Sequence, residues 1–168
     1  LDTLASTGNV ILTTSGTAGN VMIDNGTTAL GVQGTVSGDL VLTSVGAVDL
    51  GASTVSGTLG ITSGGTVTSS GKSAITGATT ISASGQAVSL TNADSSFGDF
   101  SVTAKDVYIV ESGSFSSTSI TAETVQVSAT EGVSISSTGE GLQLAAQSVK
   151  GDIEAVSYTH LRAHETSN

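Results

Sequence analysis

Residues 35–44 read TVSGDLVLTS, and residues 54–63 repeat this string as TVSGTLGITS, so seven of ten positions agree at an offset of 19. The same step separates Val10, Ala29, Val48 and Val67. A period near 20 residues is typical of solenoids, in which each repeat forms one turn that cannot bury its apolar side chains alone. The sequence therefore predicts a stack of short repeats.

The composition fits many short strands joined by tight turns. Of the 168 residues, 37% are hydrophobic but only 3% are aromatic and 11% charged, with 22 Gly and no Pro. A disordered chain would be richer in charge and proline and poorer in Val, Ile and Leu. β-branched residues favour pleated surfaces and Gly, Asn, Asp and Ser favour turns, so we expect an all-β protein.

Aligned on the 19-residue step, the chain shows three sets of alternating apolar positions. The first set comprises Val21/Ile23, Leu40/Leu42, Leu59/Ile61, Thr79/Ile81, Phe100/Val102, Val125/Val127 and Leu142/Leu144. The second comprises Val10/Leu12, Ala29/Gly31, Val48/Leu50, Val67/Ser69, Val88/Leu90, Val107/Ile109 and Val133/Ile135. The third comprises Val36, Val55, Ile75, Phe97 and Ile120, with Val149 as a less regular member.

Residues two apart on a strand share a face, so each of these sets predicts one strand per repeat with its apolar side chains pointing inward. Three short strands per repeat describe a parallel β-helix of triangular section, with 19–21 residues per coil and roughly seven coils. Coils spaced about 4.8 Å apart would make a rod about 35 Å long, with like side chains stacked on like.

Turn residues are expected between these strands. Asp24-Asn25-Gly26 and Asn92-Ala93-Asp94 predict tight corners, because Asn and Gly tolerate positive φ. The wider spacing from Ser112 to Thr121 predicts an enlarged turn. A β-sandwich also has strands every 8–12 residues, and it remains an alternative that would not repeat a string at an offset of 19. The chain contains neither the six-residue repeat of hexapeptide β-helices nor the GGxGxD repeat of calcium-binding nonapeptide rolls, so both folds are disfavoured.

The charge excludes some partners. The formal net charge is −10, and the only basic residues are Lys72, Lys105, Lys150 and Arg162, so clusters that could neutralise phosphates are missing. We therefore expect no nucleic-acid partner and no binding to anionic membranes. No cysteine is present for disulfides or thiolate metal sites, and no apolar run reaches the roughly 20 residues that span a bilayer, so no membrane insertion is expected.

The last thirteen residues differ from the rest. VSYTHLRAHET (Val156 to Thr166) contains both histidines and the only Arg, and it resembles the one-frame translation of a transposase-end sequencing adapter. We therefore predict three segments: 1–7 as an incomplete first coil, 8–155 as the β-helix, and 156–168 as a disordered, non-native tail. The alternative, His160 and His164 as a metal pair at i and i+4, lacks the HExxH glutamate.

No credible catalytic, cofactor or metal site emerges from the sequence. A β-helical polysaccharide lyase or hydrolase needs grouped carboxylates and basic residues, whereas the acids here, Asp39, Asp49, Asp99 and Asp106, fall on different coils or in different columns. Of these, Asp99 and Asp106 are the pair that could approach. Calcium at Asp24 and Asn25 is an alternative to a plain Asx turn. We expect a protein without enzymatic activity or cofactors.

The first strand of each repeat predicts two outward columns, and an ice-binding hydroxyl array would need regular threonines or serines in both. One expected column runs Val41, Gly60, Thr80, Ser101, Gln126 and Gln143, and the other runs Asp24, Thr43, Thr62, Ser82, Thr103 and Ser128. Only the second column is rich in hydroxyls, which disfavours ice binding.

Strings such as GNVILTTS, GDLVLTS, ATTISASGQAVSLTNA and FGDFSVTAKDVYIV resemble the repeats of very large bacterial exoproteins, above all filamentous-haemagglutinin-like adhesins. The resemblance covers roughly residues 8–155. It implies a right-handed parallel β-helical shaft, secretion to the surface of a Gram-negative cell, and adhesion to host or neighbouring cells through the parent protein.

On this resemblance the chain is an internal shaft fragment that acts as a rigid spacer. An alternative is that the fragment itself binds surface glycans through its outward Ser/Thr/Gln face. Cut coils expose strand edges, so we also expect edge-to-edge self-association of the isolated fragment.

Overall fold

The computed structural model describes residues 8–137, 143–148 and 150–157, which form fifteen strands and no helix. The strands are β1 (Asn9–Thr13), β2 (Val21–Asp24), β3 (Leu30–Val36), β4 (Leu40–Ser44), β5 (Val48–Val55), β6 (Leu59–Ser63), β7 (Val67–Ser69), β8 (Ser73–Ile75), β9 (Thr79–Leu90), β10 (Phe100–Glu111), β11 (Phe115–Thr121), β12 (Thr124–Ala129), β13 (Val133–Ser137), β14 (Gln143–Ser148) and β15 (Ile153–Ser157).

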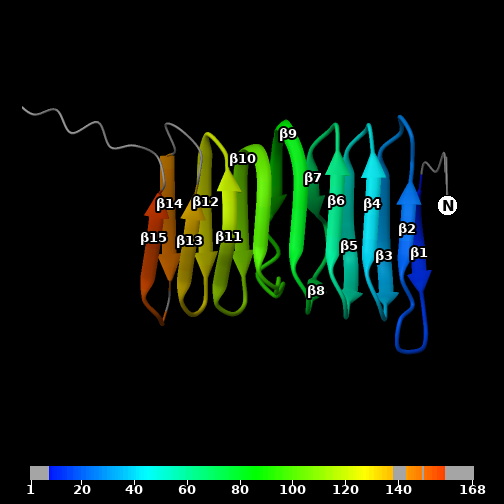
Figure 1. The fold of residues 1–168 in the computed structure, drawn as a ribbon, viewed down its shortest axis with the longest axis horizontal. Coiled ribbons are helices and arrows are strands. Elements are labelled where there is room, and N and C mark those ends of the chain that lie inside the picture. The colour runs from blue at the N-terminus through cyan, green and yellow to red at the C-terminus, as the bar shows by residue number, and fades with distance from the viewer. Residues whose placement is uncertain (1–7, 138–142, 149, 158–168) are drawn as a thin grey trace, which may run out of the picture.

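The chain winds into a β-solenoid of about seven turns, as expected from the sequence. Every strand pairs in parallel with a strand of a neighbouring coil, for example β2 with β4 and β4 with β6. In Figure 1 the chain advances from right to left while the front strands β2, β4 and β6 run upward and β1, β3 and β5 behind them run downward. This winding is right-handed, the hand of nearly all parallel crossovers.

Three faces can be distinguished around the coil. The first face consists of β2, β4, β6, the first half of β9, the first half of β10, β11, β13 and β15. The second face consists of β1, the first halves of β3 and β5, β7, the second halves of β9 and β10, β12 and β14. The third face is short and consists of 34–36, 53–55, β8 and the bridge between Ala74 and Ser96.

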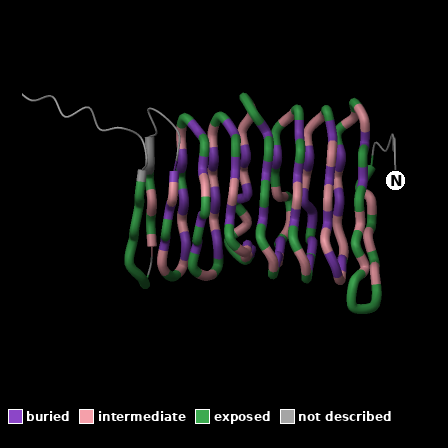
Figure 2. The backbone as a smooth tube through the Cα atoms, viewed as in Figure 1, coloured by how far each residue is buried: buried purple, intermediate pink, exposed green. Residues whose placement is uncertain are grey.

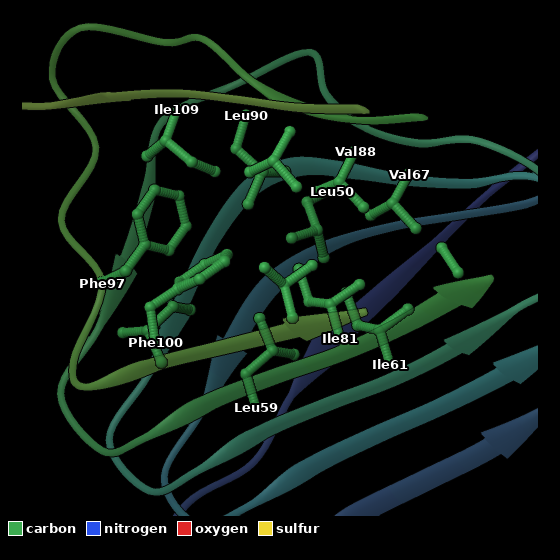
Figure 3. Packing of buried hydrophobic residues seen from close by; sticks show 14 of the residues in the cluster. Leu50, Leu59, Ile61, Val67, Ile81, Val88, Leu90, Phe97, Phe100 and Ile109 are labelled. Atoms are coloured by element: carbon green, nitrogen blue, oxygen red, sulfur yellow. The ribbon is translucent and has the colours of Figure 1, made fainter. Parts of the chain in front are cut away.

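Inward side chains of the first face stack in a continuous column, which confirms the central expectation. Leu40 pairs with Leu59, Leu59 pairs with Thr79, and all three are buried. Figure 2 shows the resulting alternation of buried and outward positions along the strands. In Figure 3, Leu59 and Ile81 point toward side chains of the opposite face such as Leu50, so one core runs through the rod.

One early register expectation is wrong. The second face receives Leu30 and Val32 from β3 rather than Ala29 and Gly31, because Val10 pairs with Val32 and Leu30 pairs with Val48. A shift of one residue reverses which side chains of a strand point inward. Burying Leu30 and Val32 removes more apolar surface from water than burying Ala29 and Gly31, so this register is the more stable one.

Beyond Phe100 the predicted sets exchange faces. Val125/Val127 pair with Val107/Ile109 on the second face, not with Phe100/Val102. Ile120, expected on the third face, pairs with Val102 on the first. Val133/Ile135 lie on the first face, and Leu144 lies on the second face opposite Val125. Leu142 and Val149 lie outside the described residues.

The exchange has a structural cause. The third face ends near Phe97, and each later coil contains one strand on the first face and one on the second. Ser112 to Thr121 is therefore not an enlarged turn, because β11 begins at Phe115. The apolar alternation is the same on every face, so it cannot reveal that one face has stopped.

The two predicted corners are confirmed. Gly26 has φ +59° and its N–H donates to Asp24 Oδ1 over 3.0 Å, which forms an Asx turn. At the other corner the Asp94 N–H donates to Asn92 Oδ1 over 3.1 Å, and the Ser95 N–H donates to the Asn92 carbonyl oxygen.

Glycines stack on one another where the chain enters the first face. Gly38, Gly57, Gly77 and Gly98 occupy this place in four successive coils, and the Gly57 and Gly77 N–H groups each donate to the glycine carbonyl one coil before over 3.0 Å. A Cβ on Gly77 would lie 2.6 Å from the Gly57 carbonyl oxygen, and a Cβ on Gly98 would overlap the Gly77 carbonyl oxygen. We call these four residues the glycine ladder. Only glycine lets the coils approach this closely.

All three phenylalanines of the sequence gather where the third face ends. The Phe97 and Phe100 ring centroids are 5.9 Å apart, and those of Phe100 and Phe115 are 5.6 Å apart. These edge-to-face and tilted arrangements are the favourable ones for aromatic pairs. The aromatic cluster fills the core where the number of strands per coil changes.

Thr79 interrupts the apolar column, and its buried hydroxyl oxygen has no hydrogen-bond partner. Because the unpaired hydroxyl is costly, Thr79→Val is expected to raise the free energy of unfolding by about 1–2 kcal/mol. Urea unfolding would measure the change. The control is Thr80→Val on the exposed neighbour, where about 0.5 kcal/mol or less is expected. Equal effects at both positions would contradict this reading of Thr79.

The predicted segment boundaries are only partly covered by the described structure. Residues 1–7 and 158–168 lie outside it, and so do His160 and His164, the disfavoured alternative of a metal pair. Strand β15 extends two residues into the predicted tail, since Val156 and Ser157 pair with Ser136 and Ser137.

Candidate functional site

The acidic residues near the first face hold neighbouring coils together. The Asp39 N–H donates to Asn20 Oδ1 over 2.8 Å, and Asp39 Oδ1 accepts hydrogen bonds from the Thr58 N–H over 2.7 Å and its hydroxyl over 3.0 Å. The backbone hydrogen bond from Thr58, followed by that from its hydroxyl, lowers the pKa of Asp39. Each side chain thus caps a backbone group 19 residues further on, which is a structural role.

Asp49 plays the same part on the second face. Its Oδ1 accepts hydrogen bonds from the Thr68 hydroxyl over 2.8 Å and from the Ser70 N–H over 3.0 Å, while the Ser70 hydroxyl donates to Oδ2. These three bonds occupy both oxygens of the carboxylate, so the geometry explains Asp49 without a ligand.

The corner at Asp24 was the candidate calcium site. Asp24 accepts the Gly26 N–H, and Asn25 is buried with its Nδ2 donating to the Thr28 and Ala29 carbonyl oxygens over 3.0 Å each. The Asn25 amide thereby closes the turn on itself. Throughout residues 8–137, 143–148 and 150–157, no three Asp, Glu, His or Cys side chains group as metal ligands would.

Among the carboxylates considered for polysaccharide cleavage, the two that could approach lie on different faces of the coil. Asp99 precedes β10 on the first face, whereas Asp106 begins the half of β10 that lies on the second face. Asp39 and Asp49 lie on an earlier coil, and both serve the hydrogen bonds given above. Lys72, Lys105 and Lys150 are all exposed.

The outward columns of the first face differ from those expected from the sequence. Gln126, Ser128 and Gln143 lie on the second face, and Ser119 and Thr121 take the places expected for Gln126 and Ser128. Three successive coils therefore carry paired outward hydroxyls, Thr80/Ser82, Ser101/Thr103 and Ser119/Thr121. Thr43 and Thr62 extend one of the two columns toward the N-terminal coils. This uncharged hydroxyl patch is broader than the sequence indicated.

The second face carries a shallow hollow around Tyr108. It has a volume of about 400 Å³ and is lined by Ser89, Thr91, Tyr108, Ile109, Val110, Gln126 and Ser128. A second hollow of about 360 Å³ shares Gln126 and Ser128 with it and continues to Gln147. Every side chain that lines the two hollows is uncharged, although the whole protein has a net charge of −10.

Sequence reasoning missed Glu111, the one charged side chain among the buried described residues. It ends β10, where its side chain points inward after Val107 and Ile109. The strict alternation Val107, Ile109, Glu111 was a signal that could have found it, because a carboxylate at the third inward position of a strand is exceptional.

These features define a repeat-containing β-solenoid protein whose regular hydrogen bonding is structural. Residues 37–104, which run from the turn before β4 into the first half of β10, match a family described as repeats of unknown function (DUF5649). Neither the search of curated proteins nor the search of solved structures found a match. In the part of the chain that the structure describes, no helix is long and apolar enough to cross a membrane.

Proposed function

We propose that this chain is a shaft segment of a large secreted or surface-displayed adhesin of a Gram-negative bacterium, in which it acts as a rigid spacer. The observation that carries the proposal is the unbroken parallel pairing of coil on coil from β1 to β15. An element whose core and hydrogen bonds repeat along one axis supplies length and stiffness. The resemblance to exoprotein repeats supplies the cellular setting.

The polar residues support a spacer without enzymatic activity or a bound cofactor. Asp39 and Asp49 accept hydrogen bonds from the next coil, and Asp24 closes a turn. Catalysis of hydrolysis or elimination requires an acid and a base that converge on one substrate atom. Asp24, Asp39 and Asp49 stabilise a turn and the contacts between coils instead.

A second candidate function, glycan binding by the segment itself, is favoured by the hollow on the second face. Tyr108 offers an aromatic ring that is half-buried, and Gln126 and Ser128 offer uncharged hydrogen-bonding groups beside it. Sugars commonly bind to surfaces that combine an aromatic ring with amides and hydroxyls. This function would place adhesion within the shaft rather than at its tip.

One replacement experiment separates the two candidates. In the full-length gene product, residues 8–155 are exchanged for an unrelated β-solenoid of the same number of coils, and cell adhesion is measured. A spacer requires only length, so adhesion is expected to persist after the exchange and to fall when the segment is deleted. Loss of adhesion in the exchanged protein would overturn the spacer proposal and support glycan binding.

A further inference from the structure

Glu111 occupies the place where the rod changes its cross-section. The last pairing on the third face is the bridge between Ala74 and Ser96, and from there on each coil passes from the second face back to the first without a paired third-face strand. Glu111 ends the second-face half of β10 at this transition and is only 3% exposed. The aromatic cluster of Phe97, Phe100 and Phe115 lies at the same level of the rod.

Only one of the two oxygens of the Glu111 carboxyl group has a hydrogen-bond partner. The Phe97 N–H donates to Oε1 over 2.9 Å, while Oε2 is buried without any hydrogen-bond partner. The backbone carbonyl oxygen of Glu111 accepts the Thr130 N–H over 3.1 Å. A buried charge with one unpaired oxygen is strongly unfavourable, whereas a neutral acid in the same place is tolerated.

No opposite charge offsets this cost among the described residues. The elements packed against Glu111 are the segment 92–97, strand β12 and the turns on either side of β11 and β12. Their charged residues are Asp94, Glu123 and Glu131, all acidic and exposed, and Glu131 Oε2 accepts the Ser114 hydroxyl. β9 contributes no charged residue, and Lys105 is exposed earlier on β10. The surroundings of Glu111 therefore disfavour its ionised form.

We propose that Glu111 makes the junction between the three-strand and two-strand coils a proton-controlled joint, closed when the carboxyl is neutral and loosened when it ionises. The joint consists of the segment 92–97, the end of β10 and the turn 112–114. It separates two stretches of regular coil, so its opening changes the stiffness of the rod at one defined level. The inference concerns this fold alone and does not depend on the adhesin proposal.

The direction of the pH effect follows from burial. Burial raises the pKa of Glu111 from 4.5 to about 7, against the smaller opposing effect of the Phe97 hydrogen bond. In the unfolded chain the group ionises near its ordinary pKa, so the folded state holds the proton more tightly. The contribution of Glu111 is therefore fully present below about pH 4.5 and is lost as the pH rises through about 7.

The first test compares Glu111→Gln with the unaltered protein. Glutamine keeps an oxygen that accepts the Phe97 N–H but cannot ionise. The ratio of the two unfolding equilibrium constants, measured in urea at each pH, is expected to change roughly 200-fold between about pH 4 and about pH 8, with the variant becoming relatively more stable at high pH. The matched control Glu131→Gln removes an exposed charge and should leave its ratio nearly constant. A constant ratio for Glu111→Gln would overturn the proposal.

The second test needs no variant and locates the effect. Amide hydrogen exchange, corrected for intrinsic rates, is compared between about pH 6 and about pH 8.5 in peptides from 92–115 and from 40–63. Protection is expected to fall with rising pH in 92–115 far more than in 40–63, because opening begins at the joint. Equal losses of protection in the two regions would show that Glu111 acts on global stability only, and would refute the joint.

Discussion

Replacing Gly98 with alanine is expected to destabilise the solenoid by about 2–3 kcal/mol. The added Cβ would overlap the Gly77 carbonyl oxygen, which is backbone and cannot move aside as a flexible side chain could. Neighbouring coils would have to separate at the glycine ladder, weakening the hydrogen bonds there. The gain of about 0.4–1 kcal/mol from a less flexible unfolded chain is too small to compensate. Thermal and urea unfolding would measure the change.

Gly113 provides the matched control for this substitution. A Cβ at Gly113 would have no heavy atom within 4 Å, so Gly113→Ala is expected to change stability by about 0.5 kcal/mol or less. The comparison isolates the close approach of coils from the general effect of removing a glycine. If both variants were equally stable, the glycine ladder would not be a packing constraint.

Truncation of Phe100 is expected to have the largest effect of any single substitution described for this protein. Phe100 is fully buried and contacts the rings of both Phe97 and Phe115. Phe100→Ala removes the centre of the aromatic cluster and leaves a cavity, which costs about 3–5 kcal/mol in well-packed cores. Equilibrium unfolding in urea, monitored by circular dichroism, would measure the loss.

Two variants bracket the effect of this truncation. Phe100→Leu retains most of the apolar volume and should lose distinctly less stability than Phe100→Ala. Val45→Ala changes a side chain that is 65% exposed, so about 0.5 kcal/mol or less is expected. A Phe100→Ala protein as stable as the Val45→Ala protein would show that the aromatic cluster is dispensable.

The repeat string at 35–44 and 54–63 was sufficient to predict the fold class. A period of 19 with alternating apolar residues predicts coils that stack on one another. The pairing of Leu40 with Leu59 follows from this stacking. The corner at Asp24 was also predictable, because Asn-Gly has few conformations outside turns. Both features depend on residues that are close together in the sequence, so they can be recognised without knowledge of the folded structure.

The face to which each later strand belongs could not be predicted in the same way. Val127 and Ile135 have equivalent neighbours in the sequence, and the loss of third-face pairing beyond Ser96 places Val127 on the second face and Ile135 on the first, the reverse of the expectation. That loss depends on how the aromatic cluster and Glu111 fill the core, which is a matter of three-dimensional packing. The broader hydroxyl patch and the Tyr108 hollow depend on the same placement of strands, so they were out of reach as well.

The direction of the inter-coil hydrogen bonds has a mechanical consequence. Strands lie across the rod, so the bonds between them point along it, and a pull on the two ends of the chain detaches the coils one after another rather than all at once. Peeling off one coil of 19 residues exchanges about 4.8 Å of rod for about 65 Å of extended chain. Under tension the protein would lengthen in steps and dissipate a sudden load, as a shock-absorbing tether does.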